Sequence, residues 1–205
     1  LPVFLVLVAS GLGIWAHSVN AVMPGIIDEA LYIWQAERLL DGHVTDSVPE
    51  HRESVGMPFS SSRNGRRFAH YPLGFPLALA PWVLAGYPWA LNIVLGVGSL
   101  LLLFRFVRRI DGAPVAWIAM FLAALSPFFI AQSTIFLSHP LALFLTLVLL
   151  EALARWRDEP SRALWPLVAG LATGYAFNVS PFVAAPMAAV AAERWLTNRE
   201  RSVQR

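Results

Sequence analysis

The chain has 205 residues, of which 57% are hydrophobic and 14% are charged, and its mean hydropathy is +0.59. Soluble domains carry about 25% charged and about 45–50% apolar residues, so this composition excludes an ordinary soluble domain and indicates a membrane protein. The formal net charge is only +2 and the basic residues, all arginine, are dispersed, which argues against a nucleic-acid partner. Because the chain has no cysteine, disulfides and thiolate metal sites are excluded.

An apolar segment opens the chain, and residues 1–22 are long enough to span a bilayer. The segment has neither the basic start nor the small-residue cleavage site of a signal peptide. Because the sequence begins inside this segment with Leu1 and not with methionine, we expect the chain to be part of a longer protein.

The next segment, Ile26–Asp41, opens with two adjacent acids, Asp28 and Glu29. Helical spacing places Tyr32 and Gln35 on the same face as Asp28. The apolar stripe beside this face consists of Ile27, Leu31 and Trp34. We therefore expect an amphipathic helix on the membrane surface, with its carboxylates in water. The structural alternative is that acids in the first turn simply stabilise the helix dipole.

A polar stretch follows, at roughly residues 43–71. Its basic and imidazole side chains include Arg52, Arg63, Arg66, Arg67, His51 and His70. The pair Asn64-Gly65 is a strong hairpin signal, which predicts a small β-ribbon over residues 59–68.

The element Tyr-Pro-Leu-Gly-Phe-Pro, at residues 71–76, is too rich in proline and glycine to begin an ordinary spanning helix. The apolar stretch after it is short, ends near Ala85 and contains Pro81. We expect a short juxtamembrane or re-entrant helix here.

The remaining apolar segments predict further spans at Pro88–Val107, Pro114–Ile130, His139–Trp156, Ala163–Phe177 and Pro181–Trp195. Arginines follow the first, third and last of these, whereas residues 131–138 and 178–180 carry no formal charge. By the positive-inside rule the arginine-rich turns are cytoplasmic. The sequence therefore predicts an all-α polytopic protein of about six transmembrane helices. Residues 23–71 would form its first extracytoplasmic loop, with the amphipathic helix at 26–41.

This topology places three polar groups on the outer side: the Asp28-Glu29 pair, the polar loop, and Ser138-His139 at the start of a span. His139 has a structural alternative as part of a helix start that Ser138 caps. For the loop arginines, the structural alternative is that they are solvated surface charges with no role in binding.

The motifs occur in the order Asp-Glu-Ala-x-Tyr, Tyr-Pro-x-Gly-x-Pro, Arg-Arg, Leu-Ser-Pro-Phe and Ser-His-Pro-Leu-Ala, over roughly residues 1–190. This order resembles the N-terminal half of bacterial C-type (GT-C) membrane glycosyltransferases, the kin of protein O-mannosyltransferases and the lipid A aminoarabinose transferase. The resemblance implies that residues 1–205 are the N-terminal transmembrane module of a longer GT-C enzyme. It also implies a multi-pass protein of the bacterial cytoplasmic membrane, with its active side facing out.

The resemblance further implies an inverting glycosyltransferase that moves a sugar from a polyprenyl-phosphate donor to a hydroxyl of a lipid, glycan or protein acceptor. Asp28, with Glu29 beside it, matches the catalytic acidic position and would act as general base. The leaving phosphate needs donors or cations. The candidates for the donor phosphate or the acceptor are Arg63, Arg66, Arg67, His70, Tyr71 and His139. His139 stands where many members have a second acid.

One departure from the family pattern is Ser180-Pro181, where members often have Arg-Pro, so one expected phosphate contact is missing. A non-catalytic protein, such as an inactive relative, a scaffold or a transporter, is the competing hypothesis. Spans nearly free of charge disfavour an ion-coupled transporter. A ligase or polymerase of lipid-linked glycans is the enzymatic alternative. The side chains that could hold a divalent metal are Asp28, Glu29, His70 and His139, without a spaced ligand motif.

Overall fold

The computed structural model describes residues 1–20, 25–48 and 59–203, and most of these residues are helical, as predicted. The elements in chain order are α1 (Pro2–Asn20), α2 (Ile27–Leu40), β1 (Asp46–Ser47), β2 (Ser60–Arg63), β3 (Arg66–Ala69), α3 (Gly74–Leu84), α4 (Ala90–Leu125), α5 (Pro127–Thr134), α6 (His139–Asp158), α7 (Leu164–Val179) and α8 (Pro181–Val203).

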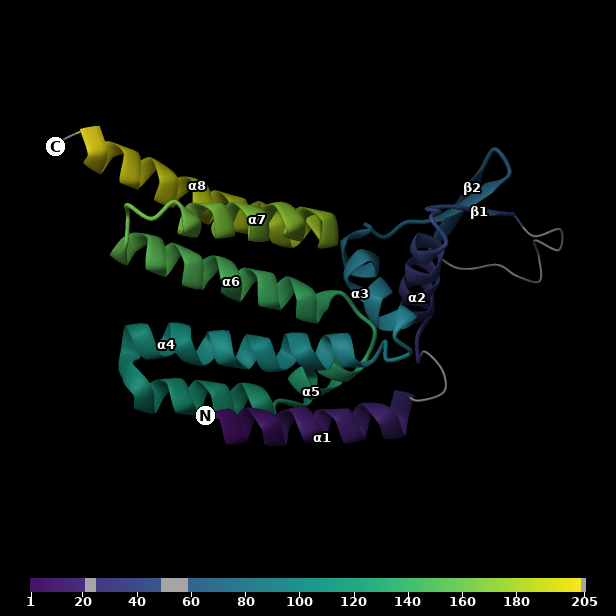
Figure 1. Cartoon of the computed structure of the whole chain (residues 1–205), viewed down its shortest axis with the longest axis horizontal. Coiled ribbons are helices and arrows are strands. Elements are labelled where there is room, and N and C mark those ends of the chain that lie inside the picture. The colour runs from purple at the N-terminus through teal and green to yellow at the C-terminus, as the bar shows by residue number, and fades with distance from the viewer. Residues whose placement is uncertain (21–24, 49–58, 204–205) are drawn as a thin grey trace.

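The long helices lie side by side, and the short elements gather at one end of them (Figure 1). The bundle consists of α1, the two arms of α4, α6, α7 and α8, whereas α2, α3, α5 and the strands lie at one end, which we call the α2 end. The opposite end holds the reversal of α4 at Gly112 and the end of α6, and we call it the Gly112 end.

A reversal at Gly112 divides α4 into two arms. Gly112 has a φ of 85°, a left-handed conformation that glycine adopts without steric cost. This is the turn that the sequence predicted between two spans. The second of these spans is shorter than predicted, because Ser126 leaves the helical conformation before Pro127. The Ser126 hydroxyl then accepts a hydrogen bond from Phe129 N at 3.4 Å and caps α5.

By length and composition, α4 and α6 are apolar enough to cross a membrane. Shorter apolar helices are Pro2–Ala16, Gly74–Leu84 and Leu164–Val179. A full span needs about 20 apolar residues. The helices α4 and α6 meet this criterion, and α4 contains two of the predicted spans in its two arms; the division into six separate spans stays a prediction. The 11-residue helix α3 is the short helix that the sequence predicted.

The strands form a three-stranded antiparallel sheet in the order β1-β3-β2. The predicted hairpin is confirmed: β2 and β3 pair, and both residues of the turn between them, Asn64 and Gly65, have positive φ values of 53° and 73°. Such values are required by the two-residue turn whose twist matches that of the strands. Pairing of Asp46 and Ser47 with β3 was not predicted.

The helix predicted at residues 26–41 is confirmed as α2, but it lies differently from the prediction. Tyr32 and Gln35, on the face expected to face water, are buried at 5% and 4% exposure. Of the apolar stripe, Leu31 is buried as expected, whereas Ile27 is 49% exposed. The reason is that α3 packs along this face, and Tyr32 joins a core with Phe75 and Leu79. This arrangement fixes the first turn of α2 against the bundle.

Candidate active site

A pocket of about 470 Å³ lies at the α2 end of the bundle. Four residues that the sequence singled out line it, and they come from three separate segments of the chain: Asp28, His70, Tyr71 and His139. The start of α8 at Ser180 completes the wall. The fold thus brings together the first turn of α2, the Tyr-Pro element and the start of α6.

The half-buried Asp28 is paired with the Tyr71 hydroxyl, which hydrogen-bonds to its carboxylate. Burial, then the hydrogen bond to Asp28 and the charges of Asp28 and Tyr32, together raise the pKa of Tyr71 to about 12. Tyr71 therefore stays protonated at neutral pH and acts as the donor. A carboxylate offers about four acceptor positions, so Asp28 can accept a second hydrogen bond, from another donor, while it is bonded to Tyr71.

Glu29 has different surroundings from its neighbour, because its side chain is buried at 1% exposure and is not part of the pocket wall. Its Oε1 accepts a hydrogen bond from Ile26 N at 3.2 Å, and its Oε2 accepts one from Phe136 N at 3.0 Å. The first contact closes the start of α2. The second joins α2 to the segment that leads into α6.

The segment between α5 and α6, residues 135–138, is also held from its other side by Asn92. The Asn92 amide donates to the carbonyls of Ile135 and Leu137, the latter at 3.0 Å, and the side chain is buried at 3% exposure. Buried polar groups of this kind persist because their hydrogen bonds are made. Glu29 and Asn92 together therefore position the residues that begin α6.

Sequence reasoning did not single out Asn92. A signal for it was present, because Asn92 is a lone amide near the start of a predicted apolar span, where a polar side chain needs an internal partner.

Aromatic side chains build the wall between Asp28 and α6. Tyr32 stacks on Tyr71 with ring centroids 5.0 Å apart, meets Phe75 edge-on at 4.9 Å, and donates to the Ser138 hydroxyl at 3.2 Å. Burial raises the pKa of Tyr32, the hydrogen bond with Ser138 lowers it, and the charge of Asp28 raises it. Gln35 fixes the Tyr71 backbone by donating from its amide to the carbonyl at 3.1 Å.

Glycine at position 74 lets α3 begin directly against the end of α7. A Cβ at this position would lie 2.4 Å from the Asn178 carbonyl oxygen, which real contacts do not allow. The Gly74 carbonyl in turn accepts a hydrogen bond from the Tyr175 hydroxyl at 2.8 Å. This close approach brings the Tyr71 segment next to Ser180.

Each of the two histidines has one ring nitrogen engaged. His139 Nδ1 lies 3.0 Å from Gln132 Oε1, and His70 Nε2 lies 2.5 Å from the Ser61 hydroxyl. Because an amide oxygen only accepts, His139 Nδ1 is the donor, which leaves Nε2 for another partner.

The three arginines that the sequence proposed as phosphate ligands do not line the pocket. Arg67 lies over the Trp34 ring at 5.1 Å and pairs with Asp46 at 3.9 Å. Arg66 donates to the Thr45 hydroxyl at 2.9 Å, and Arg63 is exposed at the end of β2. The described part of the pocket wall therefore contains histidines but no arginine. The loop residues His51 and Arg52 fall outside the described residues.

Within residues 1–20, 25–48 and 59–203, no three His, Asp or Glu side chains come together as metal ligands. We therefore assign no ligand set to Asp28, Glu29, His70 or His139.

The comparison with protein families gives one match. The family model described as dolichyl-phosphate-mannose-protein mannosyltransferase matches residues 89–204. The matched part contains His139 and Ser180, whereas Asp28, His70 and Tyr71 precede it. No curated protein matches the chain, and no solved structure does.

Proposed function

The chain belongs to the dolichyl-phosphate-mannose-protein mannosyltransferase family, and from this premise we propose that it transfers a sugar from a polyprenyl-phosphate-linked donor to an acceptor hydroxyl. The acceptor would be a lipid, a glycan or a protein at the outer face of the bacterial cytoplasmic membrane. The observation that carries the proposal is the Asp28–Tyr71 pair on the wall of a pocket that also holds His70 and His139.

In the proposed reaction Asp28 is the general base. The acceptor oxygen forms a bond to the anomeric carbon of the sugar while its proton passes to the Asp28 carboxylate. The bond between that carbon and the phosphate oxygen breaks, and the polyprenyl phosphate leaves with the bonding electrons. Attack opposite the leaving group inverts the configuration. Tyr71 orients Asp28 through its hydroxyl and, with a pKa of about 12, keeps its own proton at neutral pH.

The leaving phosphate gains negative charge, which needs hydrogen-bond donors or cations. Because no arginine is among the described residues of the pocket wall, we assign this role to His70 and His139. The imidazolium form of histidine donates from both nitrogens, so His139 could hold Gln132 and the phosphate together. The arginines Arg63, Arg66 and Arg67 remain candidates for contacts with the acceptor outside this pocket.

The two adjacent acids would have separate roles. Asp28 lies on the pocket wall, whereas both oxygens of Glu29 are bonded to backbone N–H groups away from it. We therefore propose Asp28 as the catalytic residue and Glu29 as a positioning residue, which acts through residues 136–139.

The test compares Asp28→Asn with wild type in the full-length protein in membranes, using a radiolabelled polyprenyl-phosphate mannose. Asparagine keeps the size of the side chain and can still accept from Tyr71, so the fold is retained while the base is lost. We expect transfer to fall at least 100-fold, since a positioned base contributes roughly 10²–10⁴-fold. The matched control is Glu37→Gln, an exposed acid on the same helix. Unchanged transfer by Asp28→Asn would refute the assignment.

A non-catalytic relative is the second candidate, and one observation favours it: Ser180 lines the pocket where family members often carry arginine. Ser180→Arg separates the two readings. If wild type transfers nothing and Ser180→Arg does, the chain is an inactive relative that lacks its phosphate ligand. If wild type is active, the histidines suffice for the phosphate.

A further inference from the structure

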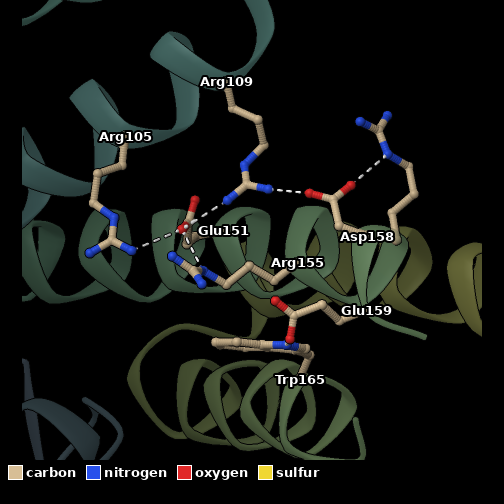
Figure 2. Close-up of polar contacts among 8 residues, drawn as sticks. Arg105, Arg109, Glu151, Arg155, Asp158, Glu159 and Trp165 are labelled. Carbon is tan, nitrogen blue, oxygen red and sulfur yellow. Dashed lines mark hydrogen bonds and ion pairs between the residues drawn. The ribbon is translucent and has the colours of Figure 1, made fainter. Parts of the chain in front are cut away.

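A second polar cluster lies at the Gly112 end, where three arginines converge on one buried glutamate (Figure 2). Glu151 of α6 is 7% exposed, and its Oε1 lies 2.8 Å from Arg155 Nε, 3.4 Å from Arg105 Nη2 and 3.5 Å from Arg109 Nη2. Only the contact with Arg155 is a short hydrogen bond. The guanidinium groups of Arg105 and Arg109 thus remain able to donate elsewhere.

The cluster carries an excess of positive charge. A pocket of about 530 Å³ is lined by Arg105, Arg108, Arg109 and Arg155 and by a single acid, Glu151. Four arginines against one glutamate leave a formal excess of three positive charges on this wall. The nearby Asp158 pairs with Arg109 and also with Arg157, which lies outside the pocket. The negative charge of Asp158 is balanced by the positive charge of Arg157, so the excess of three is unchanged.

Apolar surface adjoins the charged groups on both sides. Leu101 and Phe104 form part of the wall of the charged pocket. A neighbouring groove of about 330 Å³ shares Arg105, Glu151 and Arg155 with it, and is otherwise lined by the apolar or aromatic residues Leu102, Val148, Ala152, Trp165 and Val168. The Arg155 guanidinium carbon lies over the Trp165 ring, 4.9 Å from the ring centroid (Figure 2). A charged pocket and an apolar groove thus meet at the same three residues.

We propose that this cluster binds the phosphate of an anionic phospholipid, with an acyl chain along the groove between α4, α6 and α7. A guanidinium fork fits phosphate oxygens, and basic pockets between transmembrane helices bind anionic headgroups on the cytoplasmic side. The adjoining groove favours a lipid over free phosphate, because inorganic phosphate would leave this apolar surface uncovered. The site lies at the end of the bundle opposite the candidate active site, and it does not rest on the proposed transfer reaction.

Arg108 is the residue best suited to test the site. It lines the pocket, and within the described residues no carboxylate lies within 4.0 Å of it, so its removal leaves the Glu151 network intact. The control is Arg162→Gln, which changes an exposed arginine that pairs with Glu159 and does not line the pocket.

The experiment measures, by native mass spectrometry, how much phosphatidylglycerol and phosphatidylcholine the full-length protein retains. We expect wild type to retain phosphatidylglycerol preferentially. An arginine near a membrane surface contributes about 1 kcal/mol to the binding of anionic lipid, so Arg108→Gln should lower this preference roughly fivefold and Arg162→Gln should leave it unchanged. The double variant Arg105→Gln/Arg109→Gln should lower it further, while Glu151 keeps its short bond to Arg155.

Two results would overturn the proposal. Equal retention of the two lipids by wild type would show that the cluster is an ion network that only joins α4 to α6. Loss of bound phosphatidylglycerol on addition of millimolar inorganic phosphate at constant ionic strength would show that the site takes the free anion.

Discussion

The substitution Glu29→Gln tests whether one buried carboxylate positions the start of α6. Both carboxylate oxygens accept from backbone N–H groups, of Ile26 at 3.2 Å and of Phe136 at 3.0 Å. A glutamine has one acceptor oxygen, and its NH₂ group would face the other N–H as a second donor. A hydrogen bond to a charged group contributes about 1.5–3 kcal/mol, and a buried unsatisfied donor costs about 1–3 kcal/mol. We therefore expect a destabilisation of about 3 kcal/mol.

The assay is hydrogen exchange of the peptide that contains Phe136, measured by mass spectrometry on the full-length protein in detergent. A loss of about 3 kcal/mol corresponds to roughly a hundredfold faster exchange, since 1.4 kcal/mol is a factor of ten. Asp28→Asn should leave exchange unchanged while it abolishes transfer, whereas Glu29→Gln should change both. Glu37→Gln should change neither. Unaltered protection of Phe136 in Glu29→Gln would refute the positioning role, because the bond seen in the structure would then contribute nothing.

Two further predictions concern the Tyr-Pro-Leu-Gly element. The pKa of Tyr71 is raised to about 12 from 10.0, so between these pH values the folded protein keeps a proton that the unfolded chain loses, and stability falls as pH rises through this range. Unfolding midpoints from pH 8 to 12 should show a shallower decline for Tyr71→Phe than for wild type, and parallel curves would contradict the raised pKa of Tyr71. Gly74→Ala should destabilise by about 1–3 kcal/mol, because its Cβ would meet Asn178. Gly170→Ala, with nothing within 4 Å, should be neutral or stabilising in the same thermal unfolding assay.

Local signals in the sequence predicted the elements well. The turn at Asn64-Gly65 requires two positive φ values, and the sequence supplies the residues that adopt them. Two other features have local signals of this kind. A proline in the first turn marks the start of α6 after Ser138, and Gly112 marks the reversal between two predicted spans. Such features depend on residues that are close in sequence, so they can be predicted without knowing which distant residues they contact.

The candidate site could be predicted only in part, because its contacts join distant residues. The predicted topology puts Asp28, His70 and His139 on one side of a membrane, and in the structure all three line the same pocket. The different surroundings of the two acids could not be foreseen, because Glu29 accepts from a backbone N–H 107 residues away. Likewise, nothing local shows that Arg67 lies on Trp34 and not near His70.

Asp28 lies on the pocket wall and the loop arginines that the structure describes do not. This separation bears on which side chains could hold the donor phosphate in the proposed reaction. Among the described residues, the pocket wall has histidines but no arginine, and a guanidinium is always charged and binds phosphate oxygens through two parallel donors. Arginine at position 180 would supply such a pair of donors on the pocket wall, so we expect Ser180→Arg to lower the KM for the polyprenyl-phosphate donor. A donor KM that Ser180→Arg leaves unchanged would place the phosphate away from the start of α8.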